Sequence, residues 1–139
     1  MDIDAPLSAV WAEAIDFASH AEWMSDAADI DFATDQRSGV GTVLLVETRV
    51  GPLRTLDRFT ITEIVEPSTV RGVHDGPVTG HATWTITESE DRTRFTWEEE
   101  LRFPWFFGWR LGELVAKPIF LLLWRRNLER LRERVEAGP

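Results

Sequence analysis

The chain contains no cysteine, so it forms neither disulfide bonds nor thiolate metal sites. Nothing in its composition therefore points to an oxidising compartment. It also has no lysine or arginine before Arg37 and opens Met1-Asp2-Ile3-Asp4, so the basic start and the apolar stretch of a secretory signal are both missing. We expect a cytoplasmic location.

Long hydrophobic runs are missing as well. The longest unbroken apolar run near the C-terminal helix is Pro118–Trp124, whereas a membrane-spanning helix needs about 20 apolar residues. Arg110, Glu113 and Lys117 prevent any extension of this run towards the N-terminus. We therefore expect no membrane span.

Positive charge is scarce. The chain has 15 lysines and arginines against 24 acidic residues, a formal net charge of -9, and the first 36 residues hold nine acids without a lysine or arginine. Such a chain repels a phosphate backbone, which excludes nucleic acid as the expected partner. The arginine-rich segment Arg125–Arg134 is interleaved with Glu129 and Glu133, as on a solvated helix face.

Large apolar side chains, in contrast, are plentiful. Among 139 residues, 43% are hydrophobic, and there are 7 tryptophans and 8 phenylalanines. A chain of this length buries roughly 68% of the surface that its unfolded form exposes. We expect a single domain over residues 1–139 that folds without metal ions or disulfides.

The order of elements can be predicted from periodicity and turn signals. Met1–Ala5 is typical of a short strand, Pro6 suits the start of a helix, and residues 6–28 fit two small helices. From Asp29 onward the pattern alternates between breaks rich in glycine, proline and aspartate. Six antiparallel strands are predicted near Asp29–Thr34, Gly41–Val50, Leu53–Val65, Thr69–Asp75, Gly80–Glu88 and Thr93–Phe103.

Two of these strands show their inner faces clearly. Phe95 and Trp97 alternate with polar residues on one strand, and Trp84 and Ile86 alternate with threonines on the strand before it. Because successive strand residues point to opposite sides, Trp84 and Trp97 are predicted to face the same interior.

A C-terminal helix is predicted to cover that interior. Its apolar residues recur with helical spacing, and Pro118 within it removes a backbone hydrogen bond, so we expect the helix to bend there or to divide into two. The apolar positions are Leu111, Leu114, Val115, Pro118, Ile119, Leu122, Leu128, Leu131 and Val135.

Four segments in this order resemble a known superfamily. Ala5–Trp11 is similar to its A-P-x-x-x-V-W opening and Ala21–Met24 to the following x-x-W segment. Ile61–Pro67 resembles its strand that ends in an acid-proline turn, and Asn127–Leu131 its terminal N-L-x-x-L. The superfamily is the START-like group, also called SRPBCC, which includes polyketide cyclase/dehydrase and lipid-transport proteins.

The resemblance implies an α+β helix-grip fold. In this fold a curved antiparallel sheet of six to seven strands wraps around a long C-terminal helix, and two short helices follow the first strand. It also implies a cavity between sheet and helix for lipids, sterols, polyketides or other apolar molecules. The superfamily contains carriers, cyclases and aromatases, so the fold does not fix the function.

We expect a small hydrophobic ligand to be bound or transported in this cavity, with no cofactor. A polyketide cyclase, dehydratase or aromatase that uses the same cavity is the alternative. A module for a membrane surface or a protein partner is the second alternative. The expected ligand contacts are Trp84, Ile86, Phe95, Trp97, Leu111, Leu114, Val115, Pro118 and Leu122.

No motif for covalent catalysis or phosphate binding is present, and the three histidines are too scattered to predict a metal site. If the protein is an enzyme, His74 and His81 are candidate acids or bases, with a pairing across the turn between them as one option. Glu99 is a further candidate because it shares the face of Trp97; its structural alternative is a salt bridge to an arginine on a neighbouring strand.

The aromatic segment Phe103–Trp109 joins the last strand to the helix. Three roles are open for it: a plug at one end of the core, a lid over the ligand formed by Trp105, Phe106 and Trp109, or a contact with a membrane surface or partner. The sequence indicates no particular oligomeric state.

Overall fold

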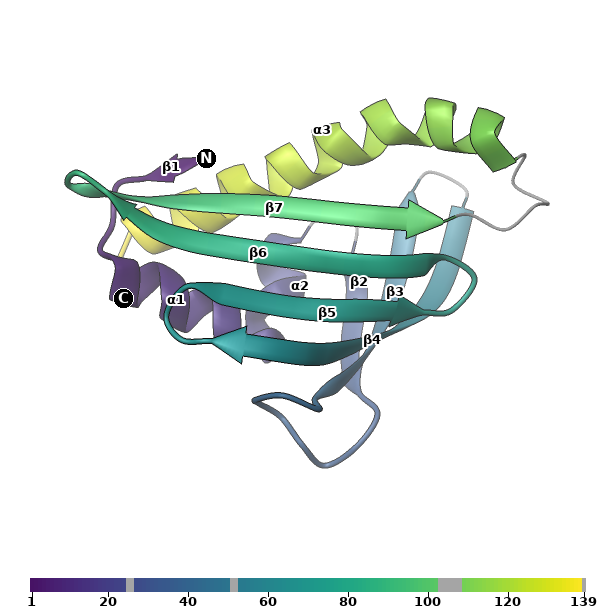
Figure 1. Cartoon of the computed structure of the whole chain (residues 1–139), viewed down its shortest axis with the longest axis horizontal. Helices are drawn as coiled ribbons and strands as arrows, with labels where there is room; N and C mark the ends of the chain where they lie inside the picture. Colours follow the sequence, from purple (N-terminus) through teal and green to yellow (C-terminus); the bar gives the residue numbers. More distant parts are fainter. Residues whose placement is uncertain (25–26, 51–52, 103–108, 139) are drawn as a thin grey trace.

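The computed structural model describes residues 1–24, 27–50, 53–102 and 109–138. A seven-stranded antiparallel sheet curves around a long C-terminal helix, with the two short helices after the first strand inside the curve (Figure 1). The predicted helix-grip fold is confirmed.

The strands follow one another across the sheet in the order β1-β7-β6-β5-β4-β3-β2, so only the first strand is out of sequence. Register shifts between Ala27 and Asp29 and between Ile61 and Glu63 accompany the curvature. The strands are β1 Asp2–Ile3, β2 Ala27–Phe32, β3 Val43–Val50, β4 Leu53–Val65, β5 Thr69–Asp75, β6 Thr79–Ser89 and β7 Arg92–Arg102.

The N-terminal helical region contains α1 (Leu7–Ile15), a 3-10 turn η1 (Phe17–Ser19) and α2 (His20–Trp23). Pro6 precedes α1, and its carbonyl oxygen accepts hydrogen bonds from the N–H groups of Ala9 and Val10 at 3.0 and 3.2 Å. A proline suits this position because its fixed φ matches the start of a helix and its missing N–H is not needed there.

The C-terminal helix α3 (Trp109–Glu136) runs without interruption through Pro118. The prediction of two helices is therefore wrong, and the alternative of one curved helix agrees with its course in Figure 1. A proline inside a helix removes one backbone hydrogen bond. The helical turns before and after Pro118 nevertheless keep α3 continuous.

The hydrophobic core fills one end of the space inside the sheet. It combines apolar residues of α1 and α2 with the inner residues of the strands and with Leu128 and Leu131 from the C-terminal half of α3. The largest fully buried side chains include Trp23, Phe17 and Phe95. The packed core thus holds the second half of α3 and the first helices together.

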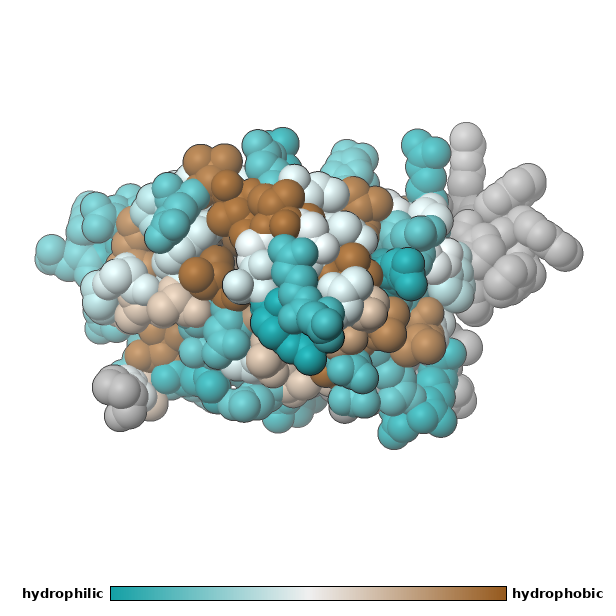
Figure 2. Space-filling view, turned by 90° about the horizontal axis from the view of Figure 1, so that it is seen from below, coloured by the Kyte–Doolittle hydropathy of each residue, from teal (hydrophilic) through white to brown (hydrophobic). Residues whose placement is uncertain are grey.

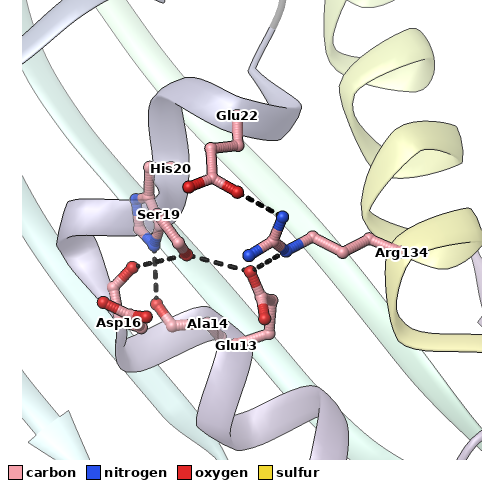
Figure 3. A network of polar contacts seen from close by, with 7 residues as sticks. All are labelled: Glu13, Ala14, Asp16, Ser19, His20, Glu22 and Arg134. Atoms are coloured by element: carbon pink, nitrogen blue, oxygen red, sulfur yellow. Dashed lines mark hydrogen bonds and ion pairs between the residues drawn. The ribbon is translucent and has the colours of Figure 1, made fainter. Parts of the chain in front are cut away.

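A polar network ties the same parts together at the surface (Figure 3). Arg134 reaches from α3 to Glu13 of α1, with Nε 2.5 Å from Oε1, and also pairs with Glu22 of α2. Ser19 Oγ lies 2.9 Å from Glu13 Oε1 and 2.9 Å from the carbonyl oxygen of Asp16. The network fixes the end of α3 against both short helices.

His20 is the one histidine of the described core. Its ring packs against Phe17, Trp23 and Trp84, and Nε2 donates a hydrogen bond to the carbonyl oxygen of Ala14 at 2.9 Å. Burial away from water disfavours the charged imidazolium and lowers the pKa of His20 to about 4. The side chain is therefore a neutral core residue at neutral pH.

The surface seen from below in Figure 2 carries several hydrophobic areas that hydrophilic side chains separate. Within the described part of the chain, no helix has both the length and the apolar character needed to cross a membrane.

We predict that acid destabilises the fold through His20. The unfolded chain binds a proton at His20 near pH 6.5 and the folded chain only near pH 4, so the free energy of unfolding falls as the pH drops between these values. The loss approaches roughly 3 kcal/mol. Urea unfolding at several pH values measures it, and His20→Gln should flatten the dependence.

A control variant and the behaviour of two carboxylates help to interpret this measurement. His81→Gln is the matched control, because that histidine is exposed and its removal should leave the pH dependence unchanged. Hydrogen bonds from arginines lower the pKa values of Asp2 and Glu47 from 3.8 and 4.5. Protonation of these two carboxylates therefore affects the free energy of unfolding only at the acid end of the pH range. An NMR titration midpoint near 6.5 for His20 would contradict the prediction.

Candidate functional site

The inner face of the sheet carries a row of aromatic side chains from neighbouring strands. Trp84 of β6 lies opposite Trp97 of β7, with ring centroids 5.5 Å apart, and Ile86 lies opposite Phe95. The prediction that Trp84 and Trp97 face the same interior is confirmed. Ile86 and Phe95 are fully covered by the core, so their contact with a ligand stays a prediction.

The middle of α3 meets the sheet through stacked aromatic rings. Trp124 stacks on Trp97 with centroids 5.7 Å apart and an interplanar angle of 20°, and Phe120 stacks on Trp124 at 5.8 Å. Flat apolar faces of this kind are typical of sites that hold small apolar molecules.

The apolar stripe that was predicted on the first half of α3 faces outward instead. Leu114 and Leu122 are 71% and 68% exposed, and Pro118 is exposed as well. The buried face of the helix, followed back from Leu131 in steps of three or four residues, leads through Leu128 to Trp124 and Phe120. A ligand contact by Leu114, Pro118 or Leu122 remains a prediction, and the side chains of Leu111 and Val115 lie outside the described ones.

His74 of β5 and Glu99 of β7 come together on the inner face although strand β6 lies between them. His74 Nε2 lies 3.8 Å from Glu99 Oε1, and the same carboxylate oxygen accepts a hydrogen bond from the indole N–H of Trp97 at 2.9 Å. The β6 positions between them are Gly80, opposite His74, and Ala82, opposite Glu99. These small residues let the two longer side chains approach each other across β6.

Asp57 is a second inner carboxylate, which sequence reasoning missed. It is only 9% exposed, and its Oδ2 accepts a hydrogen bond from Thr55 at 3.0 Å while Oδ1 has no hydrogen-bond partner. Phe59, two residues further along β4, packs against the His74 ring with centroids 4.7 Å apart. The signal was available, because Asp57, Phe59 and the buried Ile61 alternate along one strand.

The predicted pairing of His74 with His81 is wrong. Gly80 lies opposite His74, so His81 lies opposite Val73 and points to the outer face. There it is 58% exposed and lies 3.5 Å from Glu100. The alternative for Glu99, a salt bridge to an arginine, is not seen either, since its described contacts are Trp97 and His74.

Glycines shape the floor of this site. The ring of Phe59 lies over Gly72 of β5, where a Cβ atom would be 2.2 Å from the ring atom Cζ. A Cβ atom on Gly76 would be 2.7 Å from Asp57 Oδ1. Both positions therefore need glycine for a close approach from β4.

A hollow of about 540 Å³ lies on the outer face between β2, β3 and β4. Within its charged lining Glu47 pairs with Arg54, and Glu47 also pairs with Arg49 beside the hollow. No cluster of three or more metal-ligating side chains occurs in the part of the chain that is described. The inner face is the stronger candidate, since its polar atoms lack partners.

The predicted lid falls on side chains outside the described ones. Trp105 and Phe106 are not among the described residues, and the side chain of Trp109 is not described either. The role of the aromatic segment stays a prediction.

Comparisons with known proteins agree with this geometry. The family model described as "Polyketide cyclase / dehydrase and lipid transport" matches residues 1–136. No curated protein matches the sequence.

Several solved structures share the fold at low sequence identity. The Zhui aromatase/cyclase from Streptomyces sp. R1128 superposes with a TM-score of 0.80 at 13% identity, covering 99% of this chain and 94% of that one. TTHA0849 from Thermus thermophilus gives 0.76 at 20% identity, with 99% and 94% covered. The di-domain ARO/CYC BexL from the BE-7585A biosynthetic pathway gives 0.77 at 16% identity, covering 100% of this chain and 49% of that one.

We predict that Gly72→Ala destabilises the protein through Phe59. The added methyl group forces the Phe59 ring to move, and overpacking of this kind costs about 1–3 kcal/mol. Phe59→Leu removes the clashing ring atoms, so Gly72→Ala should cost less in that background. A double-mutant cycle by urea unfolding measures the coupling, and strictly additive effects would contradict the clash.

Proposed function

The chain belongs to the polyketide cyclase / dehydrase and lipid transport family, and we propose that it binds a small, mainly apolar molecule between the inner face of its sheet and the first half of α3. Binding or transport, rather than a reaction, is the role that the site favours. The ligand would lie against the rings of Trp97 and Trp124 and above the small residues of β5 and β6.

One observation carries this proposal. The middle of α3 meets the sheet through the stack of Trp124 on Trp97, whereas the C-terminal turns of the helix are held by the packed core. A ligand at the stack would gain contacts with apolar rings at the edge of the core, against which Trp97 packs. The absence of a nucleophile motif in the sequence supports binding over covalent chemistry.

We predict that the neutral fluorescent probe N-phenylnaphthylamine binds at this stack. Trp124→Leu should weaken its binding by about tenfold, because an aromatic wall is lost. Fluorescence titration of detergent-free protein measures the dissociation constants, and circular dichroism verifies that the variant is folded.

Leu122→Ala is the matched control on the same helix, since Leu122 is exposed and should not contact the probe. Equal weakening by both variants would move the ligand to the outer face of α3. Failure of the probe and of a panel of lipids and polycyclic compounds to bind would overturn the proposed function.

The second candidate is a cyclase, dehydratase or aromatase, which the approach of His74 to Glu99 favours. A histidine and a carboxylate side by side on a ligand surface can relay a proton. If this candidate is correct, a poly-β-ketone chain is cyclised, and the double variant His74→Gln, Glu99→Gln slows the reaction about 100-fold while His81→Gln does not. Mass spectrometry and absorbance of the product measure the rates, and unchanged turnover in the double variant would exclude this role for both residues.

A further inference from the structure

The inner face of the sheet holds two buried carboxylates without a lysine or arginine beside them, and the ionisable neighbour of Glu99 among its described contacts is His74 at 3.8 Å. Asp57 is 9% exposed, and the Glu99 side chain is 8% exposed. Each accepts one neutral hydrogen bond, from Thr55 and from Trp97 respectively. Across the described ranges, neither carboxylate lies within ion-pair distance of a lysine or arginine.

Elsewhere in the described chain, several acidic side chains pair with arginines at the surface. Asp2 pairs with Arg94, and Glu47 pairs with Arg54. Glu13 pairs with Arg134. The inner carboxylates thus differ from this pattern in both burial and partner.

Two further polar atoms on this face lack a hydrogen bond. Asp57 Oδ1 and His74 Nε2 are both buried without a partner. Buried polar atoms normally find one; the carboxylate oxygen of Asp57 only accepts, whereas His74 Nε2 accepts or donates according to its tautomer. A neutral His74 adds an acceptor, and a protonated His74 would balance only one of the two carboxylates.

The walls around these groups also favour a cation. The ring of Phe59 packs against His74, and Trp97, whose face stacks on Trp124, contacts Glu99 through its indole N–H group. Aromatic faces attract ammonium groups, and the attraction is strongest where water is excluded. Carboxylates and aromatic rings together form the surroundings in which a protonated amine is most stable.

We propose that the ligand carries a protonated amine on an apolar body, and that Glu99 binds the ammonium group beside His74. This inference rests on the proposed function, because it names the chemical class of the ligand at the same site. The apolar body lies on the Trp97–Trp124 stack, and the amine lies towards β4 and β5.

A matched pair of probes tests the inference. Naphthylmethylamine is protonated at pH 7, whereas naphthylmethanol has nearly the same shape and is a neutral hydrogen-bond donor. Isothermal titration calorimetry on the full chain should show the amine bound about tenfold more tightly than the alcohol. Glu99→Gln should reduce that preference to about twofold or less, because the carboxamide is uncharged.

Glu100→Gln is the matched control. It removes the same charge from the next residue of β7, on the outer face, and should leave the preference unchanged. Asp57→Asn should lower the preference by a smaller factor than Glu99→Gln.

The outcomes separate the two proposals. If neither probe binds, the proposed function fails and this inference fails with it. If both probes bind equally to the native protein, or the alcohol binds more tightly, the proposal of a protonated amine is overturned while the proposed function stands. This comparison uses the native protein alone, so it does not depend on the folding of a variant. If the preference survives in folded Glu99→Gln, the assignment to Glu99 is overturned.

Discussion

The attachment of α3 by its second half is the constraint on which the rest of the structure depends. Leu128 and Leu131 are buried in the core, and Arg134 fixes the end of the helix to Glu13 and Glu22. Further towards its N-terminus the helix meets the sheet through Trp124, which stacks on Trp97. The core therefore fixes the C-terminal turns of α3, and the proposed ligand would lie beyond them, at the Trp97–Trp124 stack.

Buried polar atoms without a hydrogen bond occur both in the core and on the inner face of the sheet. In the core they are the indole N–H groups of Trp11, Trp23 and Trp84. Asp57 Oδ1 and His74 Nε2 lie further along the inner face. Each such group costs about 1–3 kcal/mol when its partner is missing. A ligand that supplied a partner to Asp57 or His74 would recover part of this cost.

The alternation of apolar and polar residues along the strands gave the most accurate sequence-based predictions. It predicted β5 to the residue and placed Trp84, Trp97 and Glu99 on the inner face. The same rule would have revealed Asp57 from its spacing to Phe59, and it would have separated His74 from His81 once Gly80 was placed opposite His74. Register across a turn depends on which residues pair, and the sequence alone does not specify the pairs.

The helix was harder to predict, because apolar residues occur on more than one side of its first half. Leu114 and Leu122 extended the predicted stripe, yet the buried side continues from Leu131 to Trp124. A hydrophobic pattern identifies the buried side only where the other side is polar, which holds from Arg125 onward.

His74 and Glu99 lie close together but are not hydrogen-bonded to each other. A catalytic base is oriented by a hydrogen bond, and the 3.8 Å between His74 Nε2 and Glu99 Oε1 is too long for one. The Trp97 indole fixes the Glu99 carboxylate instead, by a hydrogen bond of 2.9 Å. A carboxylate held in place by a neutral donor keeps its negative charge available to a ligand. The same pair becomes a proton relay only if a substrate draws the two side chains together.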